Sequence, residues 1–272
     1  MSAVTIGIIG GTGWIGRGIA QHLLDQSVVM PDQLWIANRS GEHLPEQWHD
    51  SAIHYTSDHQ ALADACDVVM LSVRPQQLPE VSFSLHSQLL VSVMAGVTIE
   101  RLVDLTNATS VARAMPNAAI EIGESFTPWY SRYLSLTHQD WLRRILTAFG
   151  QAYVCENESQ LDYFTALTGS GQGVLTAIAG SMMESAVVQG LSPELAEQAV
   201  RQLFSGIGQL MAVDELSPQA RADVCLDYAG TTAAAIQGMR DNGLDKAIRA
   251  GLDAAYHKAI SDMTVGDNHQ DH

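Results

Sequence analysis

The sequence predicts an α/β domain with a doubly wound, mostly parallel sheet over residues 1–157, followed by an all-α domain over residues 158–272. In the first half, short apolar runs alternate with helix-length segments, which is typical of parallel sheets covered by helices. After about residue 158 no strand-like run stands out, and helical patterns follow one another. The length of 272 residues, with 46% hydrophobic residues, allows two ordinary domains.

The strands of the first domain are expected where short runs are rich in Val, Ile and Leu. These runs cover residues 4–9, 34–37, 53–55, 68–73, 89–94, 110–114 and 151–154. Helices are expected between most of them, including residues 14–26, 61–65 and 139–149. The alternation favours parallel pairing of neighbouring strands.

Helices make up the whole of the second domain. They are expected at residues 160–167, 173–189, 193–211, 218–224, 231–242 and 244–261. Two of them begin with a serine followed by a proline, at Ser192-Pro193 and Ser217-Pro218. A serine N-cap followed by proline in the first helical position is a strong start signal.

The helix expected at residues 173–189 is apolar nearly all round, with Glu184 as its one charged residue. Such a helix must be covered on every side. A membrane span is the alternative, but the segment carries several polar side chains and has no flanking positive charge. We therefore expect a second copy of the chain to cover it, in a homodimer or a higher homo-oligomer.

Composition excludes several classes of partner. The formal net charge is −16, so nucleic acid and anionic membranes, which bind basic surfaces, are not expected.

The chain opens directly into a strand-like run, with no basic, apolar leader. Cys66, Cys155 and Cys225 lie far apart and form no metal-binding pair, so we expect reduced thiols, no metal and a cytoplasmic protein.

A glycine-rich turn, IIGGTGWIG at residues 8–16, follows the first expected strand and begins the first helix. Gly11, Gly13 and Gly16 fit the pattern G-x-G-x-x-G, which permits a tight turn, close approach of a pyrophosphate and close helix–strand packing. The alternative is a glycine-rich loop without a ligand. The context predicts a Rossmann domain whose cofactor-binding turn consists of Gly11, Thr12, Gly13, Trp14, Ile15 and Gly16.

The end of the second strand indicates which dinucleotide is used. An NAD site would have an acidic residue there to bind the ribose hydroxyls. This sequence has Asn38, Arg39 and Ser40 instead. A guanidinium can hold a 2′-phosphate, and its two polar neighbours can donate hydrogen bonds to it. We expect NADPH to be preferred over NADH; the alternative is an exposed arginine in a turn.

Three more segments lie at the carboxyl ends of expected strands, where ligands of such sheets bind. Residues 72–75 and 95–96 are expected to line the ribose and nicotinamide, and the amide of Asn117 to orient a carboxamide or substrate. Each has a plain alternative as a strand-to-helix connection or a Pro-Asn turn. The residues concerned are Ser72, Val73, Arg74, Pro75, Ala95, Gly96 and Asn117.

A further anion site is conceivable at Gly230-Thr231-Thr232, where hydroxyls stand at the start of a helix. Such a site suits a substrate carboxylate. From these residues alone, an ordinary threonine N-cap is the simpler interpretation.

Several of these segments together resemble one enzyme family. They are LSVRPQQ, LLVSVMAGVTIERL, VARAMPN, TALTGSGQG, MMESAVVQGLSPELAEQAVRQLFSGIGQLM and AGTTAAAI. Their order and spacing resemble those of pyrroline-5-carboxylate reductases from the first strand to about Asp262. The resemblance implies reduction of the cyclic imine 1-pyrroline-5-carboxylate to L-proline with NAD(P)H. It also implies a helical dimerisation domain and an active site with residues from both subunits.

The resemblance implies roles for particular residues. Gly230, Thr231 and Thr232 would bind the substrate carboxylate, and Thr232, the expected catalytic residue, would hydrogen-bond to the ring nitrogen. Met115 and Asn117 would flank the nicotinamide on the substrate side. A protonated imine accepts hydride readily, so positioning and one hydrogen bond to nitrogen suffice without a strong general acid.

The sequence departs from the family pattern on the substrate side. The usual Ser-Pro-Gly-Gly before the two threonines is Asp227-Tyr228-Ala229-Gly230, and residues 118–119 and 172–173 also differ. Asp227 would repel a substrate carboxylate or attract a cationic amine. Another imine or carbonyl substrate, or a non-catalytic NADPH-binding protein, are therefore the alternatives. The glycine turn also has one residue more than usual, so we expect Gly10 to take no part in binding.

Overall fold

The computed structural model of the protein describes residues 4–38, 48 and 51–265. They form two compact units. One contains the described residues up to Ser170 and those from Ala255 onward, and the other is Gly171–Ala254. The domain boundary expected from the sequence, between residues 157 and 158, stays a prediction.

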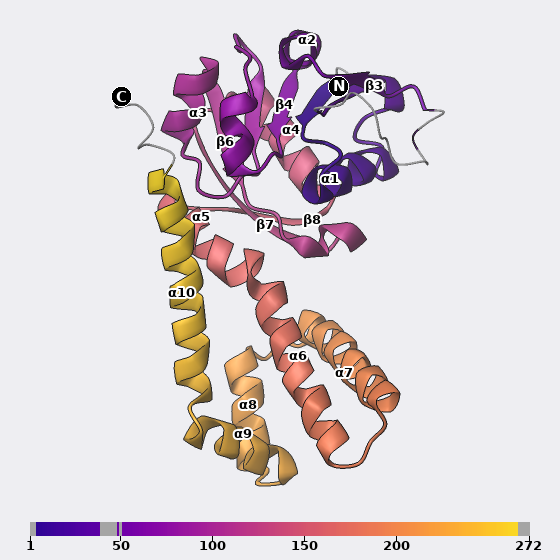
Figure 1. Ribbon diagram of the computed structural model, residues 1–272, viewed down its shortest axis with the longest axis vertical. Helices are drawn as coiled ribbons and strands as arrows, with labels where there is room; N and C mark the ends of the chain where they lie inside the picture. The colour runs from indigo at the N-terminus through magenta and orange to yellow at the C-terminus, as the bar shows by residue number, and fades with distance from the viewer. Residues whose placement is uncertain (1–3, 39–47, 49–50, 266–272) are drawn as a thin grey trace. The chain divides into compact units, whose positions relative to one another are not determined.

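One twisted sheet organises the first unit (Figure 1). Its order is β3-β2-β1-β4-β5-β6-β7-β8. The strands are β1 Ile6–Ile9, β2 Leu34–Ala37, β3 His54–Thr56, β4 Val68–Leu71, β5 Leu89–Ser92, β6 Ser110–Ala114, β7 Ser125–Arg132 and β8 Gly150–Val154. The pairs from β3 to β6 are parallel, β7 is antiparallel to β6, and β8 is parallel to β7. This confirms the doubly wound, mostly parallel sheet.

Strand β7 was not expected from the sequence. Its eight residues, SFTPWYSR, mix polar side chains with a proline, which normally argues against an inner strand. The carbonyl of this proline, Pro128, accepts a hydrogen bond from the backbone N–H of Met115 (2.9 Å). The strand thus holds the segment that follows β6.

Helices cover both faces of this sheet. They are α1 Trp14–Asp25, α2 His59–Ala65, α3 Ile99–Thr106, α4 Leu136–Thr147 and α5 Ser159–Phe164, with short 3-10 turns η1 Pro31–Gln33, η3 Pro75–Glu80 and η4 Ala118–Ile122, and a π-helical turn η5 Thr165–Gly169. Successive strand residues point to opposite faces. Ile8 therefore packs in one core with Ile19 of α1, and Ile9 packs in the other with Leu62 of α2 and Leu102 of α3.

The second unit is helical and has almost no interior of its own. Its elements are α6 Gly171–Val188, α7 Pro193–Val213, α8 Pro218–Asp227, α9 Thr231–Asp241 and the beginning of α10 Leu244–Val265. The hydroxyls of Ser192 and Ser217 accept hydrogen bonds from the first turns of α7 and α8, as expected. Within 171–254, all of which the structure describes, only Ala196 and Val200 are buried.

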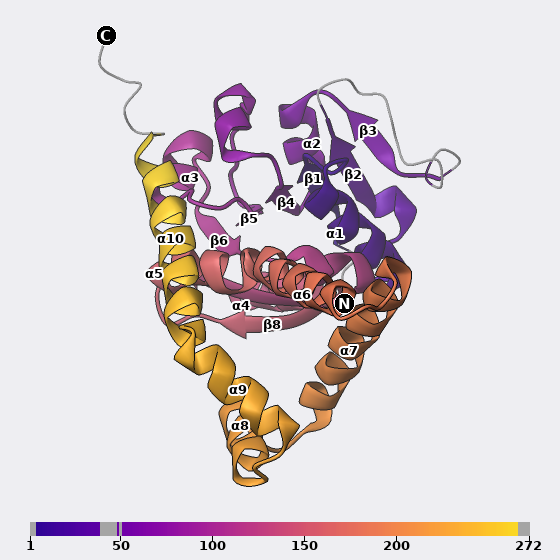
Figure 2. The ribbon, with the colours of Figure 1, turned by 60° about the horizontal axis from the view of Figure 1, so that its bottom comes forward.

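The end of α10 returns to the first unit. Both views show it beside α5 (Figures 1 and 2), and the ring of Tyr256 meets that of Tyr163 edge-on with centroids 5.7 Å apart. Within the part of the chain that the structure describes, none of the helices combines the length and apolarity needed to cross a bilayer.

Candidate functional site

A cavity of about 940 Å³ opens at the carboxyl ends of β1, β2, β4 and β5. This is the edge of a doubly wound sheet where ligands bind, and the volume is within the range of cofactor sites. Ten residues expected at the cofactor line it: Thr12, Gly13, Trp14, Ile15, Asn38, Ser72, Val73, Arg74, Pro75 and Ala95. Gly11, Gly16, Gly96, Met115 and Asn117 do not line it.

Gly10, which was expected to take no part in cofactor binding, lines the cavity as part of the glycine-rich turn, and its role in binding stays a prediction. It has a φ of 85°, and a Cβ on it would lie 2.6 Å from the carbonyl oxygen of Ser72. Its own carbonyl accepts a hydrogen bond from the N–H of Gly13 (3.0 Å). Gly11 and Gly16 are instead buried in packing contacts behind the turn, against Ile36 and the Gly10 backbone.

The N-terminus of α1 lies at this cavity, which Gly13, Trp14 and Ile15 line. Gly13 is the N-cap and supplies no side-chain hydrogen bond, and the first turn contains no acidic residue. The first N–H groups of a helix have no partner within the helix, and the helix dipole favours an anion there. This arrangement fits the pyrophosphate of a dinucleotide.

Trp14 connects this turn to the segment after β6. Its indole N–H donates a hydrogen bond to the carboxylate of Glu121 in η4. The side chain is 49% exposed and lines the cavity. This contact could not be predicted from the sequence, because the two residues are far apart in the chain.

Asn38 lines the cavity at the end of β2, but Arg39 and Ser40, its proposed partners at a 2′-phosphate, lie outside the described residues.

Reasoning from the sequence did not single out the rest of the cavity lining, in which His59 stands at the start of α2. Burial lowers the pKa of the His59 imidazole, against the attraction of Asp58. Those other lining residues are Ile9, Gly10, Ala37, Ser57, His59, Gln77, Glu80, Val81, Val93 and Met94.

The segment after β6 is held firmly by β7. The N–H of Asn117 donates to the hydroxyl of Ser125 (3.0 Å), and this hydroxyl lies 2.9 Å from that of Thr127. Both hydroxyl residues are buried. The side-chain oxygen of Asn117 accepts from the N–H of Ala119 (3.0 Å) and so caps η4. The turn-forming interpretation of Asn117 thus accounts for its oxygen.

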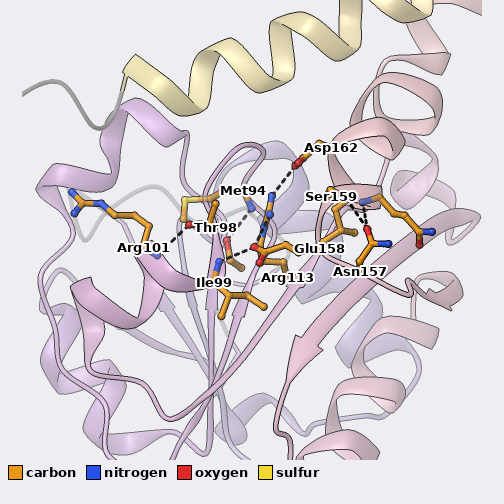
Figure 3. A network of polar contacts seen from close by, with 12 residues as sticks. Met94, Thr98, Ile99, Arg101, Arg113, Asn157, Glu158, Ser159 and Asp162 are labelled. Carbon is orange, nitrogen blue, oxygen red and sulfur yellow. Dashed lines mark hydrogen bonds and ion pairs between the residues drawn. The ribbon is translucent and has the colours of Figure 1, made fainter.

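A buried ion network lies behind this segment (Figure 3). Arg113 of β6 is 1% exposed and contacts Glu158 (2.8 Å) and Asp162 (3.5 Å). The same Glu158 oxygen accepts a hydrogen bond from the N–H of Ile99, the first residue of α3 (2.8 Å). Reasoning from the sequence did not single out Glu158. An arginine within the apolar strand run VARAM was the available signal, because a buried guanidinium requires an acidic partner.

The expected carboxylate site lies in the second unit. Gly230 is the N-cap of α9, without a side-chain hydrogen bond, and Thr231 and Thr232 occupy the first helical positions. The threonines are therefore not the N-cap, so the simpler interpretation does not describe this helix. Asp227 ends α8, and Ala229 has a φ of 53°, in the left-handed region.

The three cysteines are free, Cys66 and Cys155 being buried. Burial, reinforced by Asp67, raises the pKa of the Cys66 thiol to about 12, and burial also raises that of Cys155. Both buried thiols are therefore poor nucleophiles. Among the described residues, no group of three or more His, Cys, Asp or Glu side chains is arranged to hold a metal ion.

Comparisons with known proteins identify the relatives of this chain. The family model for pyrroline-5-carboxylate reductase dimerisation matches residues 158–261. A second model, for coenzyme F420-dependent NADP oxidoreductases, matches residues 5–96. A pyrroline-5-carboxylate reductase from Pseudomonas aeruginosa is 30% identical over 210 residues, covering 75% of this chain and 77% of that protein. The chain belongs to the pyrroline-5-carboxylate reductase family.

Solved structures of the pyrroline-5-carboxylate reductase family share the fold. The enzyme from Coxiella burnetii has a TM-score of 0.84 at 26% identity, covering 95% of this chain and 98% of that one. The Plasmodium falciparum enzyme, solved with NADP bound, has a TM-score of 0.81 at 22% identity, covering 97% and 99%. The resemblance inferred from the sequence and the expected fold class, a Rossmann domain followed by a helical dimerisation region, are both confirmed.

Proposed function

We propose that the protein reduces 1-pyrroline-5-carboxylate to L-proline with a reduced nicotinamide dinucleotide held in the cavity at the end of β1. Family membership supports the reaction. The single structural observation that carries the proposal is the glycine turn, in which Gly10 and Gly13 leave no side chain between the cavity and the N-terminus of α1.

The residues of the cavity have defined tasks in this proposal. The N–H groups at the start of α1, after Gly13, bind the pyrophosphate. The ends of β4 and β5 hold the ribose and the nicotinamide, through residues 72–75 and Ala95, which line the cavity, and through Gly96 beside them. Met115 and Asn117 flank the nicotinamide from the segment that β7 fixes.

The helix start at Gly230 binds the substrate carboxylate. Its backbone N–H groups have no side-chain cap to displace, and Thr231 and Thr232 add hydroxyls beside them. Thr232 donates a hydrogen bond to the ring nitrogen and so fixes which face of the imine is presented. When bound, the reduced nicotinamide supplies a hydride to the imine carbon.

Steady-state assays test the reaction. We expect kcat/KM with 1-pyrroline-5-carboxylate to exceed that with other cyclic imines by about tenfold or more, because a carboxylate site left empty gives up binding energy. Equal or better turnover of a cationic or uncharged imine would favour a different substrate, for which the exposed Asp227 beside Gly230 is the motivating observation. Tight NADPH binding without oxidation across the panel would indicate a non-catalytic binding protein.

The cofactor is proposed to be NADPH rather than NADH, with Arg39 and Ser40 at the 2′-phosphate beside Asn38. We expect Arg39→Ala to weaken NADPH binding by about tenfold or more and to change NADH binding little, since a charge-assisted contact to phosphate is lost. Arg74→Ala is the comparison, because Arg74 also lines the cavity. A loss selective for NADPH in Arg74→Ala alone would move the phosphate site to Arg74; equal losses for both cofactors would contradict the preference.

The protein is proposed to be a cytoplasmic homodimer or higher homo-oligomer that binds no nucleic acid. Its free cysteines suit a reducing compartment, and its net charge of −16 opposes polyanion binding. Residues 171–254 expose apolar side chains along α6 and α7, including Leu175 at 54% and Leu203 at 50%. Sedimentation of the full chain as a monomer at micromolar concentration would contradict self-association.

A further inference from the structure

Glu158 joins three parts of the first unit through one carboxylate. It stands at the N-cap of α5, and its Oε1 lies 2.8 Å from a guanidinium nitrogen of Arg113 in β6. The same oxygen accepts the backbone N–H of Ile99 at the start of α3 (2.8 Å). The Glu158 side chain is 16% exposed and that of Arg113 is 2% exposed, so both contacts are largely shielded from water.

Both partners of Glu158 are only a few residues from the proposed nicotinamide end of the cavity. Ile99 follows the turn whose first part, Met94 and Ala95, lines the cavity. Arg113 lies on β6, two residues before Met115, which follows the strand and is proposed to flank the nicotinamide. Figure 3 shows Glu158 between the start of α3 and Arg113, with dashed lines to both.

The same segments also pack against each other. Met115 forms a small buried cluster with Leu161 of α5, and Ala95 packs against that cluster. Leu161 lies on α5, the helix that Glu158 begins. A shift of α5 or of its N-cap would therefore move Ala95 and Met115 together.

A buried ion pair is poor at stabilising a fold, because desolvation offsets its attraction. Arg113 is almost wholly buried, has one unpartnered Nε, and is shared by two carboxylates. An apolar residue on β6 would serve packing as well. The directional contacts of the pair, by contrast, fix where the end of β6 and the start of α3 lie relative to each other.

We propose that Glu158, through Arg113 and the Ile99 N–H, is a positioning residue that sets the nicotinamide-binding wall of the cavity. The inference rests on the proposed function in taking this cavity as the cofactor site, and its test rests on NADPH as the cofactor. It assigns Glu158 no contact with cofactor or substrate. The adenosine end of the cavity, at β2 and α2, lies outside the network and does not depend on it.

Glu158→Gln tests the inference with two ligands that have the adenosine half in common. NADP⁺ reaches the nicotinamide wall, whereas adenosine 2′,5′-bisphosphate reaches only the adenosine half. We expect the variant to weaken NADP⁺ binding by about tenfold and adenosine 2′,5′-bisphosphate binding by less than about twofold, measured by calorimetry on the full chain. Equal weakening of both ligands, or of neither, would overturn the inference.

The matched control is Arg132→Gln. Arg132 approaches the other oxygen of the same carboxylate at 3.6 Å, but its side chain is 52% exposed. Exposed ion pairs contribute little, so both binding constants should stay within about twofold of the wild type. A loss in this variant as large as in Glu158→Gln would assign the effect to local charge rather than to the buried contacts.

A second comparison separates positioning from stability. Arg113→Met leaves the carboxylates of Glu158 and Asp162 without this partner and should lower the midpoint of urea unfolding, while Arg113→Met/Glu158→Gln should recover part of it. NADP⁺ affinity should not recover in the double variant. Its recovery together with stability would overturn the inference. Wild-type protein that binds NADP⁺ but does not reduce 1-pyrroline-5-carboxylate would contradict the proposed function and leave these binding comparisons valid.

Discussion

The position of a Cβ on Gly10 lies 2.6 Å from the carbonyl oxygen of Ser72, so the turn after β1 meets the end of β4 more closely than any side chain allows. This approach closes one wall of the cavity. Gly10 accommodates the approach with a φ of 85°, in the left-handed region that favours glycine.

Gly10→Ala should therefore damage the fold as well as the site. A left-handed φ and a backbone clash together should lower the free energy of unfolding by about 1–3 kcal/mol. The measurement is urea unfolding of the protein without cofactor. NADPH affinity should fall in parallel, because the turn must move.

Gly13→Ala is the matched control for that prediction. The nearest atom to its Cβ would be the Gly10 carbonyl oxygen at 3.3 Å, and its φ of −69° suits any residue. Stability should change by less than about 1 kcal/mol, while NADPH affinity falls by about tenfold or more, since the added methyl occupies the approach of the pyrophosphate. Unchanged NADPH affinity would argue against a pyrophosphate at this turn.

Ala229→Gly should stabilise the protein. Ala229 has a φ of 53°, which costs an L-residue about 1–2 kcal/mol, whereas glycine adopts it freely. After the larger chain entropy of glycine is subtracted, we expect a gain of about 0.5–1 kcal/mol in urea unfolding at fixed protein concentration. Ala234→Gly, inside α9, should have the opposite sign. Destabilisation by Ala229→Gly would show that its methyl group makes contacts that outweigh the backbone strain.

Asp162→Asn should raise the free energy of unfolding relative to the wild type, and this gain should grow as pH rises. Burial raises the pKa of Asp162, and this outweighs the lowering by Arg113. Because the folded state holds the proton more tightly, the stability that this group contributes is present below the unfolded pKa of about 3.9 and is lost as pH rises through the raised folded pKa. Unfolding of both proteins between pH 4 and pH 7 should show the gain of the variant growing with pH.

Asp140→Asn provides the reference for that series. Asp140 is 44% exposed and pairs with Arg143 on the same helix, so its replacement should change stability by less than about 0.5 kcal/mol at each pH. A stability difference for Asp162→Asn that is flat or falls with pH would contradict the assigned direction of the pKa shift.

Thr232→Val should lower turnover and leave cofactor affinity intact. The substitution keeps the shape of the side chain but removes the hydroxyl proposed to hydrogen-bond to the ring nitrogen. A loss of about tenfold to a hundredfold in kcat/KM corresponds to one hydrogen bond made in the transition state. Thr232→Ser, which keeps the hydroxyl, should retain most of the activity. Equal activity of the valine and serine variants would show that the Thr232 hydroxyl takes no part in the reaction.

The parallel part of the sheet was predictable because its strands are short apolar runs separated by helices. The bounds of β2 and β6 agree with those expected from the sequence. Strand β7 was missed because its stability comes from pairing on both sides, which overrides the proline and the polar side chains within it. The family was recognisable because several short motifs occurred in order, although each was ambiguous alone.

The site was less predictable than the fold because its contacts join distant parts of the chain. Glu158 lies in a polar segment that looks like a linker, and its contacts with Arg113 and Ile99 depend on where β6 and α3 come to lie. Gly10 was set aside because the pattern G-x-G-x-x-G counts residues and carries no information on φ. For Glu158 the deciding quantity is its distance to residues of β6 and α3, and for Gly10 it is the distance to Ser72 at the end of β4. The spacing of residues along the chain predicts neither distance.

Residues 171–254 bury only Ala196 and Val200 within the part of the chain that the structure describes. A segment with so little interior gains most of its folding free energy from whatever covers its apolar helices. If another copy of the same chain covers these helices, folding of this unit is bimolecular. The midpoint of thermal unfolding then rises with total protein concentration, and dilution destabilises this unit.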